Sequence, residues 1–436
     1  MSQANYASPR FPDDIGGAAL YAKVAWRIMP ILFIGYIVAY LDRVNVGFAK
    51  LQMMADLHFS DAVYGLGSGI FFVGYFLFEV PSNIILHKVG ARRWICRVLV
   101  VWGFVSALTA FVHTPWQFYG ARAILGIAEA GFFPGMVLYL TYWFPSQRRA
   151  RMMALLMAGN PVSGIIGGPL SGFIMERFAG GYGLAGWQWL FITEAAPAIV
   201  LGFLILFYLN DRVADAHWLS DSEKAELSAE IGAEAGSKTH NTIGSVFVSA
   251  RVWLMCAILF GIIMGSYAIG FWQPTIIGQT GVNDPFDIGL LTMLPYTLAL
   301  ISMIVVGRHA DSTRERRWHV VCPVLLAACG FILCTQAGAS TTIAMAGLIM
   351  AVVGIVTALP MFWSLPTSFL GGSAAAAGIA LINCTGNLAG FVSPTVIGFL
   401  KSYTGTLNSG LFLVTACLVG AALLIVFLVP AKLVNH

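Results

Sequence analysis

Charged side chains are scarce in this sequence. Only 10% of its 436 residues are Asp, Glu, Lys or Arg, whereas 58% are hydrophobic and the mean hydropathy is +0.81. A soluble domain carries roughly 25% charged residues, so this chain cannot cover a water-facing surface with charge. The net charge of +4 comes from short basic clusters between apolar runs, which is typical of membrane-protein loops. We therefore expect a lipid bilayer around the chain and no nucleic acid as a partner.

Paired metal ligands and catalytic motifs are also missing. The seven cysteines lie in or beside apolar runs, and none forms a Cys-x-x-Cys pair or a cluster with histidine. The sequence contains no His-Glu-x-x-His motif, no nucleophile elbow and no P-loop. We therefore expect no metal, no disulfide, no cofactor other than the proton, and no enzymatic activity.

Long apolar runs recur along the whole chain. Most have about 20 residues or more, and a helix of that length crosses about 30 Å of hydrocarbon. The sequence therefore predicts an all-α polytopic membrane protein with twelve transmembrane helices, located in the cell membrane and, in a bacterium, in the inner membrane. The runs centre on residues 26–48, 62–86, 94–113, 115–142, 150–175, 188–209, 252–278, 286–307, 318–338, 340–362, 374–400 and 407–429.

Lysine and arginine are distributed unevenly between the loops. With both ends of the chain inside, 19 of the 24 basic residues fall in cytoplasmic segments and two fall within spans. Only Lys50, Arg177 and Lys401 fall in external segments. Because cytoplasmic loops carry the excess of positive charge, this asymmetry predicts that both termini lie in the cytoplasm.

The longest polar stretch, at about 210–250, divides the runs into two groups of six. Within it, Ser220-Asp-Ser-Glu223 has the pattern of a capping box and predicts a short helix to about Ala235. The predicted organisation is a cytoplasmic segment 1–25, an N-terminal six-helix bundle 26–209, a cytoplasmic linker 210–250, a C-terminal six-helix bundle 251–430 and a cytoplasmic tail 431–436.

The two halves contain similar loops. Gly90-Ala-Arg-Arg-Trp94 follows the second run, and a segment that ends in Arg316-Arg-Trp318 follows the eighth. The two Arg-Arg-Trp triplets are 224 residues apart, close to half the length of the chain. Two six-helix repeats are typical of transporters in which one repeat rocks against the other, which gives alternating access to a central site.

These features resemble the major facilitator superfamily over nearly the full length of the chain. The loop at 307–317 is similar to that superfamily's Gly-x3-Asp-(Arg/Lys)-x-Gly-Arg-(Arg/Lys) motif. The matching residues are Gly307, Asp311, Arg316 and Arg317. The resemblance implies that this loop acts as a conformational latch on the cytoplasmic face.

The first copy of the latch motif is incomplete. It keeps Gly90, Arg92 and Arg93, but the acid of the motif is absent. If this copy also acts as a latch, it must find its acid elsewhere. Glu79, in the inner part of the second predicted helix, is the candidate acid.

Charged residues well inside the spans are confined to the N-terminal half. Four acids lie there: Asp42, Glu79, Glu129 and Glu194. Arg43 is adjacent to Asp42, and Arg122 lies almost two helical turns before Glu129 on the same face. A charge in a span costs at least roughly 2.5–3.5 kcal/mol unless it is solvated or paired, which makes each one a candidate for function. The alternative is that acid and base only neutralise each other and fix helix packing.

The chemistry of these residues suits an anion and a proton. We expect the two arginines at similar depth, and a guanidinium binds a carboxylate through two parallel hydrogen bonds. An arginine that binds the anion no longer stabilises an ionised acid beside it, so anion and proton would bind cooperatively. The C-terminal spans have only neutral polar groups well inside them, and we expect these to recognise substrate shape.

Several motifs together permit a narrower resemblance. They are Tyr40-Leu-Asp-Arg-Val-Asn45, Arg122-x6-Glu-Ala-Gly-Phe-Phe-Pro-Gly135, Tyr142-Trp-Phe-Pro145 and Trp363-Ser364. The combination resembles the anion:cation symporter family, whose members include proton-coupled permeases for sugar acids, tartrate, phthalate, hydroxyphenylacetate and nicotinate-type acids.

This narrower resemblance implies a role for individual residues. Arg43 would bind the substrate carboxylate with help from Arg122, while Asp42 and Glu129 would carry protons. The residues that would line the pocket are Tyr40, Tyr75, Asn160, Trp363, Ser364 and Asn383.

One position departs from the sugar-acid permeases that resemble the galactonate carrier. They have glutamine where this chain has Asn160, which is followed here by Pro161. The departure favours the tartrate, phthalate and hydroxyphenylacetate branch. The sequence thus predicts a monomeric, proton-coupled symporter that imports a small organic anion. A proton symporter for aldonates or aldarates, and a uniporter or exchanger of organic anions on the same fold, stay open as alternatives.

Overall fold

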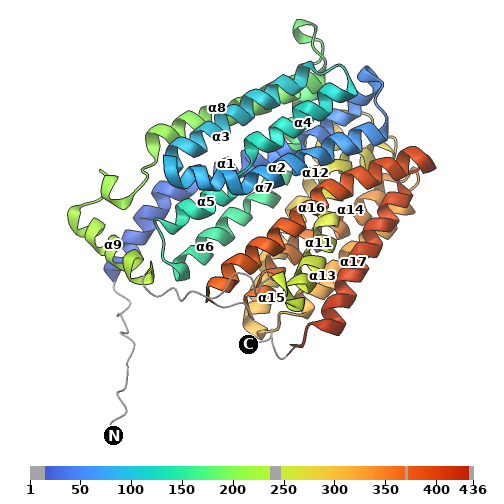
Figure 1. Cartoon of the computed structure of the whole chain (residues 1–436). Coiled ribbons are helices and arrows are strands. Elements are labelled where there is room, and N and C mark those ends of the chain that lie inside the picture. The colour runs from blue at the N-terminus through green and yellow to red at the C-terminus, as the bar shows by residue number, and fades with distance from the viewer. Residues whose placement is uncertain (1–14, 236–246, 369–371, 432–436) are drawn as a thin grey trace.

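The computed structural model describes residues 15–235, 247–368 and 372–431, and every regular element among them is helical (Figure 1). Three short 3-10 turns lie in the connections, at Thr109–Phe111, Gly181–Gly183 and Val213–Asp215. The α-helices are α1 (Ile15–Leu57), α2 (Asp61–Val89), α3 (Ala91–Leu108), α4 (Pro115–Glu129), α5 (Phe132–Thr141), α6 (Ser146–Met157), α7 (Gly159–Arg177), α8 (Gly186–Tyr208), α9 (Asp221–Ala235), α11 (Ala250–Gly278), α12 (Pro285–Thr313), α13 (Trp318–Thr335), α14 (Thr341–Phe362), α15 (Ser364–Thr367), α16 (Gly372–Thr404) and α17 (Asn408–Leu428).

Twelve stretches of the described residues are long and apolar enough to cross a membrane, which confirms the predicted all-α, twelve-span fold. Three of these spans are interrupted, because α4 and α5, α6 and α7, and α14 and α15 each share one span. The first helix begins before its apolar run, at Ile15, and continues for 43 residues. Leu20, Tyr21 and Val24 are buried there. Residues 15–25 of the predicted cytoplasmic segment 1–25 are thus helical and form the start of α1.

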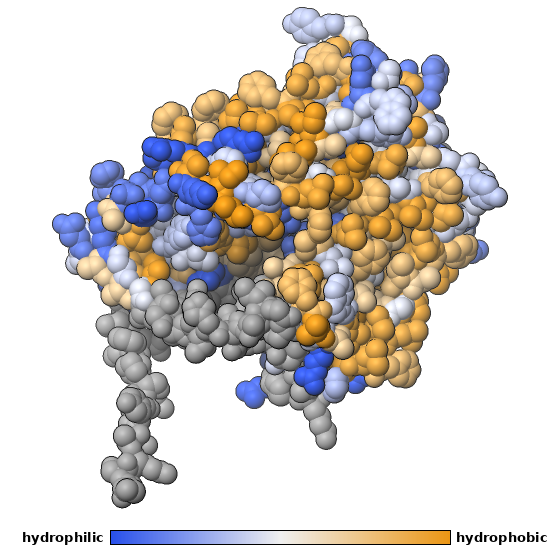
Figure 2. All heavy atoms as spheres, in the orientation of Figure 1, coloured by the Kyte–Doolittle hydropathy of each residue, from blue (hydrophilic) through white to orange (hydrophobic). Residues whose placement is uncertain are grey.

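The spans before α9 and those after it form two bundles that lie side by side, coloured blue to green and yellow to red in Figure 1. Large hydrophobic side chains, such as Phe207 and Phe427, are exposed on the outside of the bundles. Figure 2 shows that hydrophobic side chains cover most of the visible face and that hydrophilic ones gather towards its ends. An apolar surface of this extent is stable in lipid, so the chain is a multi-pass membrane protein.

The helix between the bundles, α9, starts as the sequence predicts. Ser220 Oγ accepts a hydrogen bond from the Glu223 N–H at 3.3 Å, and the Glu223 carboxylate accepts one from the Ser220 N–H at 2.7 Å. Lys23 of α1 donates to the same carboxylate at 2.9 Å, which holds the pKa of Glu223 below its ordinary value. Tyr21 donates to Glu230, so α9 is anchored to the start of α1.

The two bundles contact each other through α1 with α11, α2 with α16 and α7 with α12, and these contacts gather at the end of α1 that is far from α9. Asp61 links the bundles there, since its Oδ1 lies 2.9 Å from Lys50 Nζ and 3.0 Å from Lys401 Nζ. The Ala62 N–H also donates to Ser402 Oγ at 2.8 Å. We call this region the closed seam.

Glycines allow the closest approach along the closed seam. A Cβ on Gly168 of α7 would lie 2.6 Å from the carbonyl oxygen of Gly289 of α12, and a Cβ on Gly289 would collide with the Gly168 carbonyl. Small residues let membrane helices pack at short distance, so these two glycines set how tightly the bundles close.

Candidate functional site

An ion pair joins Arg43 of α1 to Glu129 at the end of α4. Arg43 Nη2 lies 2.9 Å from Glu129 Oε1, and the two side chains are 13% and 1% exposed. The carboxylate is thus sealed inside the N-terminal bundle, while the arginine keeps access to the space outside it. Asp42, the neighbour of Arg43, points into the bundle and is 1% exposed.

Aromatic rings surround the Arg43 guanidinium. Its Cζ lies 5.5, 5.4 and 5.3 Å from the ring centroids of Tyr40, Phe71 and Tyr75. Ring faces attract a cation within about 6 Å, with a gain of about 0.5–2 kcal/mol. Tyr267 of α11 brings the C-terminal half into the site, because it interacts electrostatically with Arg43. Nothing in the sequence separates Tyr267 from the other neutral polar residues of its half.

Arg122 lies behind this pair and is fully buried, at 0% exposure. It interacts electrostatically with both Asp42 and Glu129, and its Cζ is 5.1 Å from the Phe71 ring centroid. Its three guanidinium nitrogens have no hydrogen-bond partner among the described residues. In this conformation Arg122 balances the buried carboxylates and does not reach the open side of the site.

Glu129 owes its position to an interruption of the fourth span. α4 ends at Glu129, and α5 begins at Phe132 after Gly131, which has a φ of +87°. A side chain is strained at that φ, and a Cβ at this position would collide with Ser82 Oγ. The Glu-Ala-Gly-Phe-Phe-Pro-Gly motif therefore builds a break that ends the helix at the carboxylate. Interrupted helices of this kind form binding sites in transporters.

Four of the predicted pocket residues lie apart from this group. Asn160 follows the break between α6 and α7, Trp363 and Ser364 form the junction of α14 and α15, and Asn383 lies within α16. None of the four makes a hydrogen bond, ion pair or ring contact with Arg43 among the described residues. The structure therefore brings together the two predicted arginines, the two predicted proton sites, Tyr40 and Tyr75. The other four predicted pocket residues do not contact this group.

The first copy of the latch motif finds its acid in the linker. The Arg92 N–H donates to Asp211 Oδ1 at 2.8 Å, and Arg92 Nε lies 3.8 Å from Asp211 Oδ2. The expectation for Glu79 is wrong, because Glu79 lies ten residues before the end of α2, too far from this loop. Gly90 has a φ of +99°, and a Cβ there would come 3.1 Å from Asp211. Arg93 is exposed.

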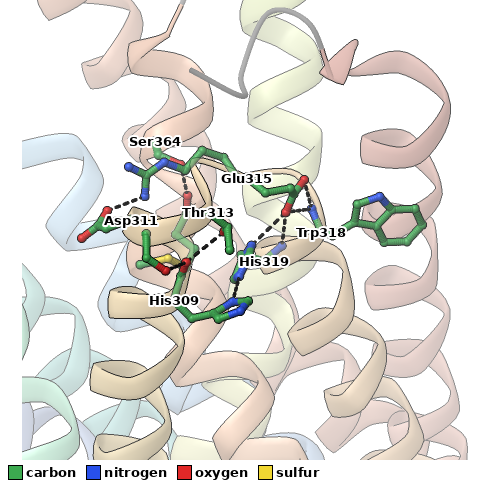
Figure 3. Close-up of polar contacts among 10 residues, drawn as sticks. His309, Asp311, Thr313, Glu315, Trp318, His319 and Ser364 are labelled. Atoms are coloured by element: carbon green, nitrogen blue, oxygen red, sulfur yellow. Dashed lines mark hydrogen bonds and ion pairs between the residues drawn. The ribbon is translucent and has the colours of Figure 1, made fainter.

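In the second copy of the latch motif, the acid pairs with an arginine of the same motif, at the loop between α12 and α13 (Figure 3). Arg316 Nη1 lies 2.7 Å from Asp311 Oδ1. Arg317 donates to the carbonyl oxygen of Val426 on α17, which ties the loop to the last span. Gly307 lies one turn before Asp311 in α12.

Two histidines near this loop are paired, although the sequence shows them only as scattered residues. His309 Nδ1 lies 2.8 Å from His319 Nε2, and His319 Nδ1 lies 2.8 Å from Glu315 Oε2 (Figure 3). The direct nitrogen–nitrogen contact leaves no space for a metal between the rings. Among the residues that the structure describes, no three His, Cys, Asp or Glu side chains converge as metal ligands.

Comparison with known proteins agrees with this architecture. The family model described as "Major Facilitator Superfamily" matches residues 32–394. The solved structure titled "Inward open conformation of the xylose transporter XylE from E. coli" superposes with a TM-score of 0.75 at 14% identity, and the match covers 93% of this chain and 96% of that one. At this identity, the likeness establishes the fold alone.

Similar sequences extend the comparison over the whole chain. The "Putative metabolite transport protein NicT" of Pseudomonas putida is 46% identical, and the alignment covers 100% of both chains. A "Putative tartrate transporter" of Agrobacterium vitis is 49% identical over 92% of each chain. The chain therefore belongs to the Major Facilitator Superfamily and is a membrane transport protein, not an enzyme.

Proposed function

We propose that this protein is a proton-coupled symporter of a small organic anion that carries a carboxylate. The Arg43–Glu129 pair carries the proposal, because its arginine is partly exposed and its carboxylate is buried. A guanidinium that pairs with a protein carboxylate also fits a substrate carboxylate of the same geometry. An incoming anion therefore competes with Glu129 for Arg43.

This competition couples the anion to a proton. When Arg43 turns to the substrate, the Glu129 carboxylate stays buried without its hydrogen-bonded partner. Arg122 alone then faces two buried acids, Asp42 and Glu129. Burial of the uncompensated negative charge is costly, so Glu129 takes up a proton as the anion binds. Asp42 is a second proton site, since Ser106 donates to its Oδ1 and its Oδ2 has no partner among the described residues.

The names of the relatives support an organic acid as the substrate. A relative that is 49% identical to this chain bears the name "Putative tartrate transporter". The aromatic rings of Tyr40, Phe71 and Tyr75 near Arg43 suit the carbon frame of an acid such as phthalate or hydroxyphenylacetate as well. The proposed substrate class is thus a small mono- or dicarboxylate.

We further propose that both termini face the cytoplasm of a bacterial inner membrane and that one chain is the working unit. In that orientation the closed seam is external, because it lies at the end of α1 away from α9. The structure then corresponds to the state that releases the anion into the cell.

Transport by the purified protein in liposomes tests this proposal. An acidic exterior should drive accumulation of at least one radiolabelled acid among tartrate, phthalate, hydroxyphenylacetate, nicotinate and an aldonate, and a protonophore should abolish it. Equal uptake with and without the pH gradient would show a uniporter or exchanger. Uptake of none of these acids would reject the substrate class.

A further inference from the structure

A row of buried polar side chains leads from Asp42 away from Arg43. Asn45 is three residues after Asp42 and so lies on the same side of α1. Glu194 of α8 lies beside Asn45 and interacts electrostatically with Asp42. Ser171 of α7 donates a hydrogen bond to Glu194 Oε1 at 2.8 Å. All four side chains are at most 4% exposed.

Glu194 has no basic partner in this row. Among the described residues, no lysine, arginine or histidine nitrogen forms an ion pair with Glu194, and its Oε2 has no hydrogen-bond partner. α1, α3 and α7 pack against α8. The groups that they bring to Glu194 are Asn45, Ser171 and one further acid, Asp42. A buried carboxylate beside a second acid is costly, so a protonated Glu194 is the stable form here.

The row continues to the closed seam between the two bundles. Ser171 lines a pocket there together with Gln273 and Thr292 of the C-terminal half. The side-chain amide atoms of Asn45 and the Nε2 of Gln273 are buried without a partner in the described part of the chain. Buried polar atoms are normally hydrogen-bonded, and water supplies the partner where protein does not. Proton-accepting and proton-donating positions therefore follow one another from the seam to Asp42.

We propose that Glu194 is a further proton-carrying residue that passes protons between the seam and Asp42. The inference rests on the proposed proton-coupled function. When the seam opens, water there gives a proton to the Ser171 hydroxyl, which passes its own proton to Glu194 Oε1. The proton that Glu194 held on Oε2 moves at the same time through hydrogen-bonded groups to the free Oδ2 of Asp42. One proton enters the row and one leaves it, with no change in oxidation state. The proton reaches Asp42 without crossing the anion site at Arg43.

The Glu194→Gln variant tests this proposal, because glutamine can still accept the hydrogen bond of Ser171 but cannot carry the proton. With radiolabelled tartrate as the probe in liposomes, accumulation driven by an acidic exterior should slow by about tenfold or more. Counterflow of tartrate moves no net proton and should stay within about twofold of the wild-type rate. Glu194→Asp should restore the driven accumulation. The control is Glu176→Gln, an exposed acid at the end of α7, which should behave as wild type.

Two transport outcomes would overturn the role of Glu194. One is driven accumulation that Glu194→Gln leaves unchanged. The other is an equal loss of counterflow and accumulation that Glu194→Asp does not rescue, which would make the residue structural. If the wild type itself shows no driven uptake, the proposed function fails instead. Infrared spectra of the ligand-free protein then decide about Glu194: the band of a protonated buried carboxyl should be present and should disappear in Glu194→Gln, and its absence from the wild type would refute the proposal.

Discussion

Arg43 is the residue that links the proposed binding of the anion to the proposed binding of the proton. Its guanidinium contacts a buried carboxylate on one side and keeps 13% of its side chain exposed on the other. The three aromatic rings around it hold the group in place at the boundary of the N-terminal bundle. A buried acid alone could hold a proton, and an exposed arginine alone could bind an anion. Coupling of anion transport to proton transport requires one group that contacts both the anion and the acid that carries the proton.

Replacing Arg43 by lysine tests the geometry of that group. Lysine keeps the charge but offers a point charge in place of the planar pair of donors. We expect Arg43→Lys to weaken anion binding at least about tenfold, which corresponds to about 1.4 kcal/mol. Calorimetric titration of the purified protein measures this. Arg97→Lys, at an exposed arginine beside Trp94, is the matched control. Equal affinity of Arg43→Lys and wild type would contradict the role of Arg43.

Replacing either predicted proton site, Asp42 or Glu129, should impair transport in a different way from replacing Arg43. Asp42→Asn and Glu129→Gln keep the shape of the side chains but remove the titrating proton. Accumulation driven by a pH gradient should be lost in both variants, while exchange of labelled for unlabelled anion should persist. A pH indicator trapped in the liposomes and a tracer anion measure both quantities in one sample. Driven accumulation at the wild-type level in the double variant would contradict proton coupling at this site.

At the scale of helices, interruptions position the functional side chains. Glu129 ends α4, Asn160 follows the break before α7, and Trp363 and Ser364 join α14 to α15. In contrast, α1 carries Asp42 and Arg43 on one uninterrupted helix of 43 residues. A break frees backbone groups and redirects the chain, so the residues beside it can face a cavity.

The break at Gly131 should tolerate no side chain. Gly131→Ala would impose a strained φ of +87° and a collision with Ser82, at a cost of about 1–3 kcal/mol. Gly120→Ala is the matched control, since Gly120 lies in α4 with nothing near its Cβ position and alanine favours a helix by about 0.5–1 kcal/mol. Thermal unfolding in detergent should show a lower Tm for the first variant and an unchanged or higher Tm for the second. Equal Tm values for the two variants would show that the break is not strained.

The helices themselves follow from sequence more completely than these breaks do. Apolar runs of about 20 residues predict each span, because lipid leaves no other way to satisfy the backbone. Hydrophobicity does not change across Ala130, so the run at 115–142 reads as one helix, although it is two. Only the positive φ of Gly131 and its contact with Ser82 of another helix reveal the break. Apolar runs also do not predict the start of α1 before residue 26, because its contact with α9 through Lys23 depends on the folded chain.

At the scale of the whole molecule, the site lies between two bundles that close at one end. The ion pairs of Asp61 with Lys50 and Lys401 hold that end together, and Lys50 also lies 3.8 Å from the Trp272 ring centroid. The sequence pattern predicts two bundles and shows that the charged residues inside the spans belong to the N-terminal one. It does not predict which residues meet across the bundles at the ends of the helices, since Lys50 of α1 and Lys401 of α16 are 351 positions apart in the chain.

Loss of the Asp61 carboxylate should open the closed seam. Asp61→Asn leaves the nearly buried Lys50 without its ion pair, at a cost of about 1–2 kcal/mol, which shifts the population of the open seam about five- to thirtyfold. Spin labels at exposed positions 55 and 403 report the distance between the bundles by pulsed electron resonance. The longer-distance population should grow in Asp61→Asn and remain unchanged in Asp287→Asn, an acid at the same end outside the network. An unchanged distance distribution in Asp61→Asn would contradict the role of these ion pairs.

The central claim is that an anion displaces Glu129 from Arg43 and that Glu129 then takes up a proton. Proton uptake on binding measures this directly, without a membrane. The anion identified by the transport screen is added to the purified protein in weakly buffered solution, and the pH change is compared with calorimetric occupancy. Binding should consume about one proton per anion in the wild type and substantially less in Glu129→Gln. Saturating binding with no change in pH would contradict the account.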